Sequence, residues 1–284
     1  MMNLDAYRLP VGDWIDAAVD WMTANLGWLF DAIAAFLKSM IEGFETGLLF
    51  PSALIFVVLV AAIAFYAKGW RFALFTAILF VVVAMMDLWD VTMSTLPLVL
   101  VASIVALIIG IPLGIIAARS DRFSGLIKPV LDLMQTMPSL VYLVPAIVFF
   151  GIGQVPGVVA TVVFAMPPSV RLTELSLRQM DAEVVEAGEA FGASPMKILT
   201  RVQIPLALPT IMAGVNQVIM LALSMVVIAG MVGAGGLGAV IFRGVTRLDV
   251  GLGFEGGLSI VIIAVFLDRI TAAFGDRASK RVSY

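Results

Sequence analysis

The sequence contains no cysteine and no histidine, and few of its residues are charged. The missing cysteine excludes disulfides and thiolate metal sites, and the missing histidine removes the commonest general base and metal ligand. Charged residues form 13% and hydrophobic residues 62% of the 284 residues, whereas about a quarter of a soluble domain is charged. The composition therefore indicates a polytopic membrane protein and argues against metal or thiol chemistry.

Long apolar runs without strand-like alternation indicate helices, because a membrane-spanning chain must satisfy its backbone polar groups internally. We therefore expect an all-α membrane protein. The predicted membrane spans are residues 49–67, 70–86, 97–118, 129–150, 155–172, 205–230 and 256–274.

The first part of the chain is amphipathic. Within residues 11–45, apolar side chains recur at helical spacing and acidic residues fall elsewhere. Trp14, Trp21 and Trp28 suit the headgroup layer. We therefore predict that residues 1–47 form an external, interfacial amphipathic segment in contact with lipid.

The positive residues give an orientation for the predicted spans. Thirteen of the 17 Lys and Arg residues fall on the side that carries Lys197 and the C-terminus. Loops rich in Lys and Arg remain in the cytoplasm. We expect a bacterial inner-membrane protein with its N-terminus outside and its C-terminus in the cytoplasm.

A polar stretch between two spans, Glu186–Pro205, predicts a short helical hairpin on the cytoplasmic side. Gly192 interrupts the helix-forming run from Glu174 to Phe191, and glycine tolerates a left-handed turn best. Ser194 and Pro195 then favour a new helix, since Ser caps helices and Pro fits their first position.

The spacing in this stretch resembles the EAA loop of ABC importer permeases, with Gly188 in place of the second Ala of that family pattern. The resemblance implies that the hairpin docks into an ATPase subunit and couples its motion to transport. The residues to which this coupling role carries over are Glu186, Ala187, Gly188, Gly192, Ala193, Ser194, Pro195, Met196, Lys197, Ile204 and Pro205.

The strings PLALPTIMAGVNQ (205–217) and LALSMVVIAGMVGAGGLG (221–238) look like permeases of glycine betaine, proline betaine and choline importers. The resemblance implies a type I, MetI-like permease core over 96–275 that contains the coupling hairpin 174–204. We expect two accessory helices in 48–95 before that core and a cytoplasmic tail in 276–284.

The same resemblance implies the partners. Such permeases work in pairs with two ATPase subunits, which bind ATP and Mg²⁺, and with an external substrate-binding protein. Because the sequence ends soon after the last span, we expect a separate receptor, and the resemblance implies a permease homodimer. We expect no cofactor on this chain, no covalent chemistry and no nucleic acid, with osmoprotection by compatible solutes as the purpose.

Polar residues within spans are expensive and are candidates for function. Asp132 and Asp268 are interpreted as lying near cytoplasmic ends, beside Lys128 and Arg269, so no mid-span carboxylate is expected to attract a cation. For Asn216, interhelical hydrogen bonding and substrate contact are equally consistent with the sequence. The candidate residues for the translocation path are Gln135, Met137, Asn216, Gln217, Met220 and Ser224.

Several alternatives remain beside the betaine permease. A permease for methionine or an anion would share the loop. An ion channel would need a selectivity filter or a charged pore ring, and neither is evident. Gly233–Gly238 contains G-x-G-x-x-G, but it follows a membrane span and not a strand, so it does not indicate a nucleotide site.

Overall fold

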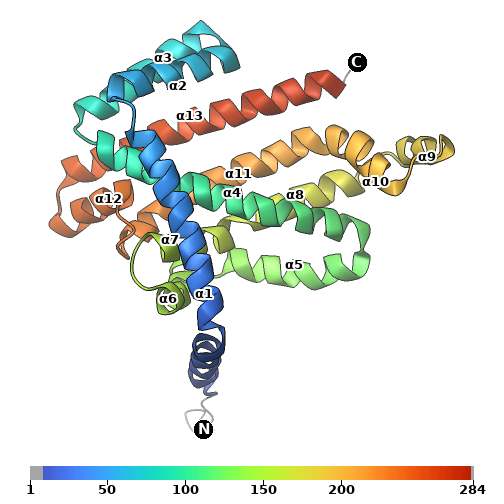
Figure 1. Cartoon of the computed structure of the whole chain (residues 1–284), viewed down its shortest axis with the longest axis horizontal. Coiled ribbons are helices and arrows are strands. Elements are labelled where there is room, and N and C mark those ends of the chain that lie inside the picture. Colours follow the sequence, from blue (N-terminus) through green and yellow to red (C-terminus); the bar gives the residue numbers. More distant parts are fainter. Residues whose placement is uncertain (1–8, 283–284) are drawn as a thin grey trace, which may run out of the picture.

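The computed structural model describes residues 9–282, and every regular element in that range is a helix (Figure 1). Long helices lie alongside one another, with α9 and α10 at one end of the bundle and α12 at the other. The elements are α1 (Val11–Leu49), α2 (Ala53–Lys68), α3 (Trp70–Met85), α4 (Trp89–Arg119), α5 (Asp121–Thr136), α6 (Ser139–Phe150), α7 (Gln154–Ala165), α8 (Pro167–Arg178), α9 (Ala182–Ala190), α10 (Pro195–Ile198), a π-helical turn (Leu199–Gln203), α11 (Ile204–Gly230), α12 (Gly236–Arg247) and α13 (Val250–Val282).

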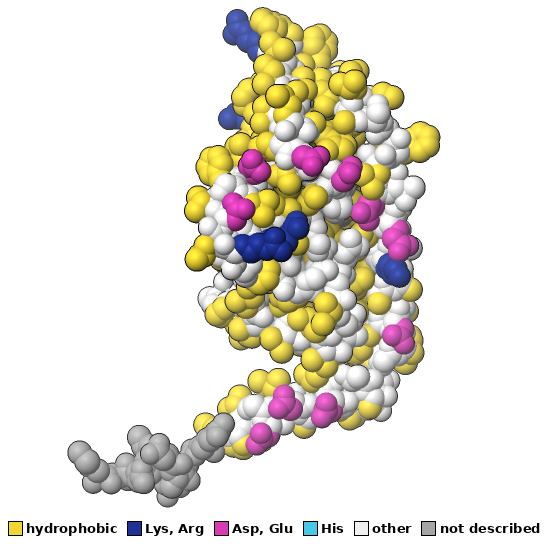
Figure 2. All heavy atoms as spheres, turned by 90° about the vertical axis from the view of Figure 1, so that its left-hand side faces the viewer, with side chains coloured by type: hydrophobic (Ala, Val, Ile, Leu, Met, Phe, Trp, Pro, Cys, Tyr) yellow, Lys and Arg dark blue, Asp and Glu magenta, His cyan; other side chains and the backbone are white. Residues whose placement is uncertain are grey.

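Each predicted span has a helical counterpart. Five segments are long and apolar enough to cross a membrane, namely α1, α4, α7 with α8, α10 with α11, and α13 up to Gly275. The bent pair α5–α6 raises this number to six, and α2 and α3 are shorter apolar helices of 16 residues each. Hydrophobic side chains cover much of the end of the bundle away from α9 and α10 (Figure 2).

The predicted span 129–150 is broken into two helices. Helices α5 and α6 meet at 98° across Met137 and Pro138. Pro138 lacks a backbone N–H and disfavours helical backbone in the residue before it. Met137 accordingly has φ −70° and ψ 139°, which is extended backbone. The proline therefore breaks the span.

Helix α1 is longer than the predicted amphipathic segment and extends to Leu49. It is apolar enough to cross a membrane, but in Figure 1 it runs steeply across the other long helices. Leu37 and Ile41 are buried against the bundle, and the ring of Phe30 stacks on Phe149 at 4.4 Å. This course fits an interfacial segment that packs on the bundle.

Helices α4 and α8 pack closely against each other. A Cβ atom on Gly114 would lie 2.6 Å from both Thr173 Cβ and the carbonyl oxygen of Val170. Gly110, one turn earlier, faces Ser169 in the same way. Small residues four apart on both helices let the backbones approach, as is common between membrane helices.

The C-terminal part of the chain continues as helix. The predicted tail 276–284 forms the last turns of α13 as far as Val282, while residues 1–8 and 283–284 lie outside the described range. The Arg277 guanidinium lies 4.3 Å from the centre of the Tyr66 ring and donates to the Tyr66 carbonyl oxygen. These contacts join the ends of α13 and α2.

Candidate coupling surface and translocation path

The predicted hairpin is present, and its turn depends on Gly192. Gly192 has φ +73°, the left-handed conformation that favours glycine. Its N–H donates to the Glu189 carbonyl oxygen at 2.8 Å, and the Ala193 N–H donates to that of Gly188 at 3.1 Å. These two bonds form a Schellman motif, which satisfies the last carbonyls of α9 and fixes the direction of the chain.

The first arm of the hairpin is shorter than the sequence indicated. The helix predicted over Glu174–Phe191 is interrupted after Arg178, and α9 covers only Ala182–Ala190. Glu174 lies inside α8 with only 4% of its surface exposed. The exposed part of the hairpin therefore begins after α8.

The second arm is continuous with the next span. Pro195 occupies the first position of α10, after Ser194 in extended backbone, although the Ser194 side chain makes no capping hydrogen bond. A π-helical turn connects α10 to α11 just before Pro205. Pro205 lacks an N–H, and its ring would clash with the carbonyl four residues earlier in a regular helix. The wider π turn accommodates the proline ring. The second helix of the hairpin and the following membrane span are therefore continuous from Pro195 to Gly230.

The hairpin has an exposed apolar tip and a buried side. Phe191 is 92% exposed and Met196 is 61% exposed, while Ile198 and Leu199 are buried. A Cβ on Gly188 would lie 3.2 Å from Ile198 Cγ1, which explains glycine where the family pattern has alanine. The exposed predicted coupling residues are Glu186, Ala187, Gly192, Ser194, Pro195, Met196 and Lys197, and the partly buried ones are Gly188, Ala193, Ile204 and Pro205.

Phe191 was not among the predicted coupling residues. The available signal was a large apolar residue beside the turn glycine in an otherwise polar stretch. An aromatic side chain this exposed, next to a rigid turn, is typical of the anchors that bury themselves in a partner's pocket. We therefore add Phe191 to the candidate coupling surface.

Two arginines connect the hairpin end of the bundle to neighbouring helices. Arg119, at the end of α4, donates to the Pro195 carbonyl oxygen at 3.3 Å. Arg178, at the end of α8, donates to the Ala117 carbonyl oxygen at 2.7 Å and contacts the Asp121 carboxylate at 2.6 Å. The ends of α4, α5, α8 and α10 are thereby held together.

The buried carboxylate of Glu174 is the centre of this connection. It accepts from the Ser124 hydroxyl at 2.6 Å, and lies 2.9 Å from Arg178 Nε and 3.6 Å from Lys128 Nζ. A buried carboxylate needs such partners, because an unpaired buried charge is strongly destabilising. These contacts join α8 to α5 at the hairpin end of the bundle.

Three predicted path residues share one face of α11. Gln217, Met220 and Ser224 are exposed and recur at helical spacing, and Ala213 continues the same face. The Ser224 hydroxyl donates to the Met220 carbonyl oxygen at 3.0 Å. A polar and small-residue face in the middle of a membrane helix fits a water-filled path or a second protein copy better than lipid.

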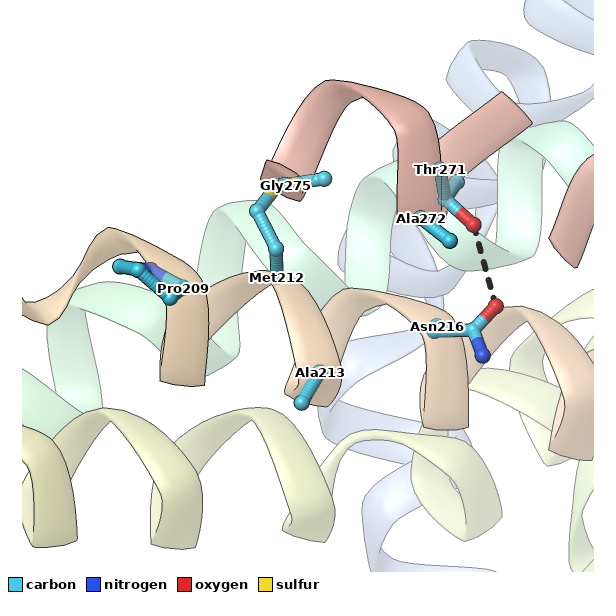
Figure 3. A pocket seen from close by; sticks show the side chains of 7 residues that line it. All are labelled: Pro209, Met212, Ala213, Asn216, Thr271, Ala272 and Gly275. Atoms are coloured by element: carbon cyan, nitrogen blue, oxygen red, sulfur yellow. Dashed lines mark hydrogen bonds between the residues drawn. The ribbon is translucent and has the colours of Figure 1, made fainter. Parts of the chain in front are cut away.

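Asn216 faces another way and contacts α13. Its Nδ2 donates to Asp268 Oδ1 at 2.7 Å, and its Oδ1 accepts from the Thr271 hydroxyl at 3.0 Å. Figure 3 shows the hydrogen bond that joins Asn216 and Thr271, and both residues line a cleft of about 340 Å³ between the two helices. Met212 and Gly275 line its other end. Asn216 is thus engaged in interhelical hydrogen bonding beside an open cavity.

The other two path candidates, Gln135 and Met137, lie neither on the exposed face of α11 nor at this cavity. Gln135 is partly buried near the end of α5. Met137 lies at the break before α6 and lines a different, apolar cleft, which it shares with Ile15 and Val19 of α1. The described residues contain no group of three or more acidic side chains able to hold a metal ion.

The structure thus combines a bundle of apolar, membrane-length helices with an exposed hairpin between two of them. Residues 110–284 match the family described as "Binding-protein-dependent transport system inner membrane component". The chain belongs to this family, so the predicted membership of the ABC importer permeases is confirmed. It is a multi-pass inner-membrane permease component, not an enzyme, and its family implies ATPase and substrate-binding partners.

Relatives with known roles match nearly the whole chain. The glycine betaine transport system permease protein OpuAB of Bacillus subtilis is 49% identical over 93% of this chain and 94% of its own length. The glycine betaine/proline betaine transport system permease protein ProW of Escherichia coli is 45% identical over 96% of this chain and 77% of its own length. The predicted similarity to betaine permeases is therefore confirmed.

Solved structures support the fold. An inward-facing structure of the MetNI methionine ABC transporter matches with a TM-score of 0.58 and 24% identity, over 70% of this chain and 97% of the matched chain. At this identity the likeness shows the fold alone. The predicted MetI-like bundle is confirmed.

Proposed function

We infer that this chain is the permease of an ATP-driven importer for glycine betaine, proline betaine or choline-type compatible solutes. The observation that carries the substrate class is the 49% identity to a glycine betaine permease along 93% of this chain. The likeness to a methionine transporter is at the level of fold, so no specific observation favours methionine.

The α9–α10 hairpin couples movement of the ATPase to movement of the membrane helices. Phe191 and Met196 bury themselves in a cleft of the partner ATPase, which binds ATP and Mg²⁺, while this chain binds no cofactor. Closure of the ATPase pair moves the α9–α10 hairpin, and the contacts of Arg119, Arg178 and Glu174 pass that motion to α4, α5 and α8. The bundle then alternates between inward and outward access.

The working assembly is a homodimer with two ATPase subunits and a separate external receptor. The exposed face of α11 that carries Gln217, Met220 and Ser224 supports the pairing, because a second copy would cover it or enclose a path beside it. Capture of the solute by the receptor leaves the permease to pass it on.

Transport is the direct test of this function. Proteoliposomes that hold the permease, its ATPase and its receptor should accumulate labelled glycine betaine when ATP is supplied, and omission of the receptor should abolish uptake. If the complete system carried only methionine or an anion, the substrate class would be wrong.

The proposed orientation places the N-terminus outside and the hairpin and C-terminus in the cytoplasm. The support is the placement of 13 of the 17 Lys and Arg residues on the side that carries the hairpin, as the positive-inside rule expects of a cytoplasmic face; Figure 2 shows few basic side chains on the opposite end. The chain has no cysteine, so Asp13→Cys and Ser194→Cys can each be labelled alone. An impermeant reagent should label only the first in intact cells, and the reverse result would overturn the orientation.

A further inference from the structure

A cleft of about 440 Å³ lies between the first half of α1 and α6, which are next to each other in Figure 1. One wall contains Ile15 and Val19 of α1, and the other contains Val141, Val144 and Val148 of α6. Ile15, Val144 and Val148 are each exposed over more than half of their surface. The volume falls within the about 300–1,000 Å³ typical of small-molecule sites. The cleft is therefore open, apolar and large enough for a ligand.

The polar groups of the cleft are few. Asp16 is the one charged residue among the described residues that line it. The Tyr142 hydroxyl, also in the lining, already donates to the Leu133 carbonyl oxygen at 2.9 Å. The sequence has no Lys or Arg in 11–37 or in 129–170, so neither wall supplies a positive charge. Apolar walls with a single carboxylate favour a ligand that has an apolar part and a positive group.

The tryptophans of α1 place Asp16 at the level of the lipid headgroups. Trp14, Trp21 and Trp28 recur every seven residues, which is about two helical turns, and all three are exposed. Exposed tryptophan in a membrane protein prefers the boundary between headgroups and hydrocarbon. Asp16 is two residues from Trp14, or about 3 Å along the helix axis. A lipid headgroup can therefore reach the Asp16 carboxylate.

We propose that the cleft between α1 and α6 binds phosphatidylethanolamine, a phospholipid with a primary amine in its headgroup. An acyl chain lies against Val141, Val144 and Val148, and the headgroup ammonium donates to the Asp16 carboxylate. Hydrogen bonds between ionised groups are roughly twice as strong as neutral ones. An anionic headgroup meets no cation in these walls, and the quaternary ammonium of a choline headgroup has no N–H to donate. The site is independent of the transported solute.

The proposed lipid also contacts the break between α5 and α6. Met137, at the break, is part of the lining of the cleft. Tyr142 bridges the break by its hydrogen bond to Leu133. The other protein contact between α1 and α6 is the stack of Phe30 on Phe149 at 4.4 Å. A bound lipid therefore fills the space that these two helices leave between them.

A second copy of this chain could also cover an apolar cleft. Protein in the cleft would exclude acyl chains from it, and the occupant would not change with the headgroups of the surrounding lipid. A bound lipid gives the opposite result on both counts. Lipid probes with different headgroups therefore separate the two occupants.

The experiment places the full-length permease in vesicles of equal parts phosphatidylethanolamine, phosphatidylcholine and phosphatidylglycerol. Each lipid in turn carries a photoreactive diazirine in its acyl chain, and mass spectrometry measures the labelling of residues 137–148. The ethanolamine probe should label this segment about threefold more than the glycerol probe, the effect of one exposed ion pair. Asp16→Asn should remove the preference but retain the labelling. Val144→Trp should lower labelling by every probe, because the indole fills the cleft.

Matched controls are Asp31→Asn, at an exposed carboxylate farther along α1, and Val58→Trp, at an exposed valine of α2; neither residue lines the cleft. Both should be labelled like the unmodified chain, and thermal unfolding reports that each variant has folded. Equal labelling by the three probes would overturn the proposal. No labelling by any probe would overturn it in favour of a second copy. Unchanged labelling in Val144→Trp would also overturn it, since the label would then come from lipid outside the cleft.

Discussion

Gly114 in the α4–α8 contact and Gly192 in the hairpin turn are both required as glycines, but for different physical reasons. A Cβ on Gly114 would meet Val170 and Thr173 at 2.6 Å, whereas a Cβ on Gly192 would meet nothing within 4 Å. Gly192 has φ +73°, and Gly114 has ordinary helical backbone. Gly114 is therefore required for its small volume, and Gly192 is required because its backbone conformation is unfavourable for residues with a Cβ atom.

These two reasons for glycine distinguish the membrane bundle, which contains the α4–α8 contact, from the α9–α10 hairpin. The α4–α8 contact is buried and joins two spans, so a change there acts on the stability of the whole bundle. The hairpin is exposed and is held by two backbone bonds and by Arg119. A change there should act on assembly with the ATPase and leave the membrane bundle intact.

The largest expected effect is that of Gly114→Ala. The added methyl group would press on a backbone carbonyl that cannot move independently, and we expect a loss of about 3 kcal/mol in stability, the upper range for overpacking. Thermal unfolding in detergent measures it. Gly125→Ala in α5 is the matched control, since its Cβ meets nothing within 4 Å; equal stabilities for the two variants would contradict the packing argument.

Gly192→Val should come next, at about 2 kcal/mol, because left-handed backbone is costly for a residue with a Cβ and worst for a β-branched one. The loss should appear as reduced co-purification of the ATPase and reduced uptake, with normal membrane insertion. Gly192→Asn is the informative partner, since asparagine tolerates this conformation. Full ATP-driven uptake by Gly192→Val would remove the basis for the turn's role.

Phe191→Ala removes the exposed anchor without any change to the turn. We expect a loss of about 1 kcal/mol or more in affinity for the ATPase, as for an interface anchor, and no change in thermal stability. Phe50→Ala, at a residue 90% exposed between α1 and α2, is the control. An ATPase affinity equal to that of the unmodified permease would exclude Phe191 from the interface.

Arg119→Gln should have the smallest effect. It removes a single hydrogen bond to the Pro195 carbonyl oxygen, worth about 1 kcal/mol. We expect nearly normal assembly but fewer solute molecules imported per ATP hydrolysed, because the hairpin is less firmly joined to α4. The ratio of uptake to hydrolysis in proteoliposomes measures this, and an unchanged ratio would mean that Arg119 plays no part in coupling.

Local patterns in the sequence determined the membrane class, the helical spans, the turn at Gly192 and the restart at Pro195. These features depend on composition, on periodicity and on backbone preferences of single residues, all of which a linear sequence contains. Pro138 also marked the break between α5 and α6, yet a proline within a span predicts either a kink or a break, and the 98° bend required the three-dimensional structure.

Only the tertiary structure decided which faces of the helices meet. The burial of Glu174, the exposure of Phe191 and the pairing of Asp268 with Asn216 each depend on how a helix is rotated and tilted against its neighbours. Asp268 accepts a hydrogen bond from Asn216, 52 residues away in the sequence. Hydropathy along one helix cannot reveal a partner on another, because the alignment of two helices is set by side-chain packing along their whole contact.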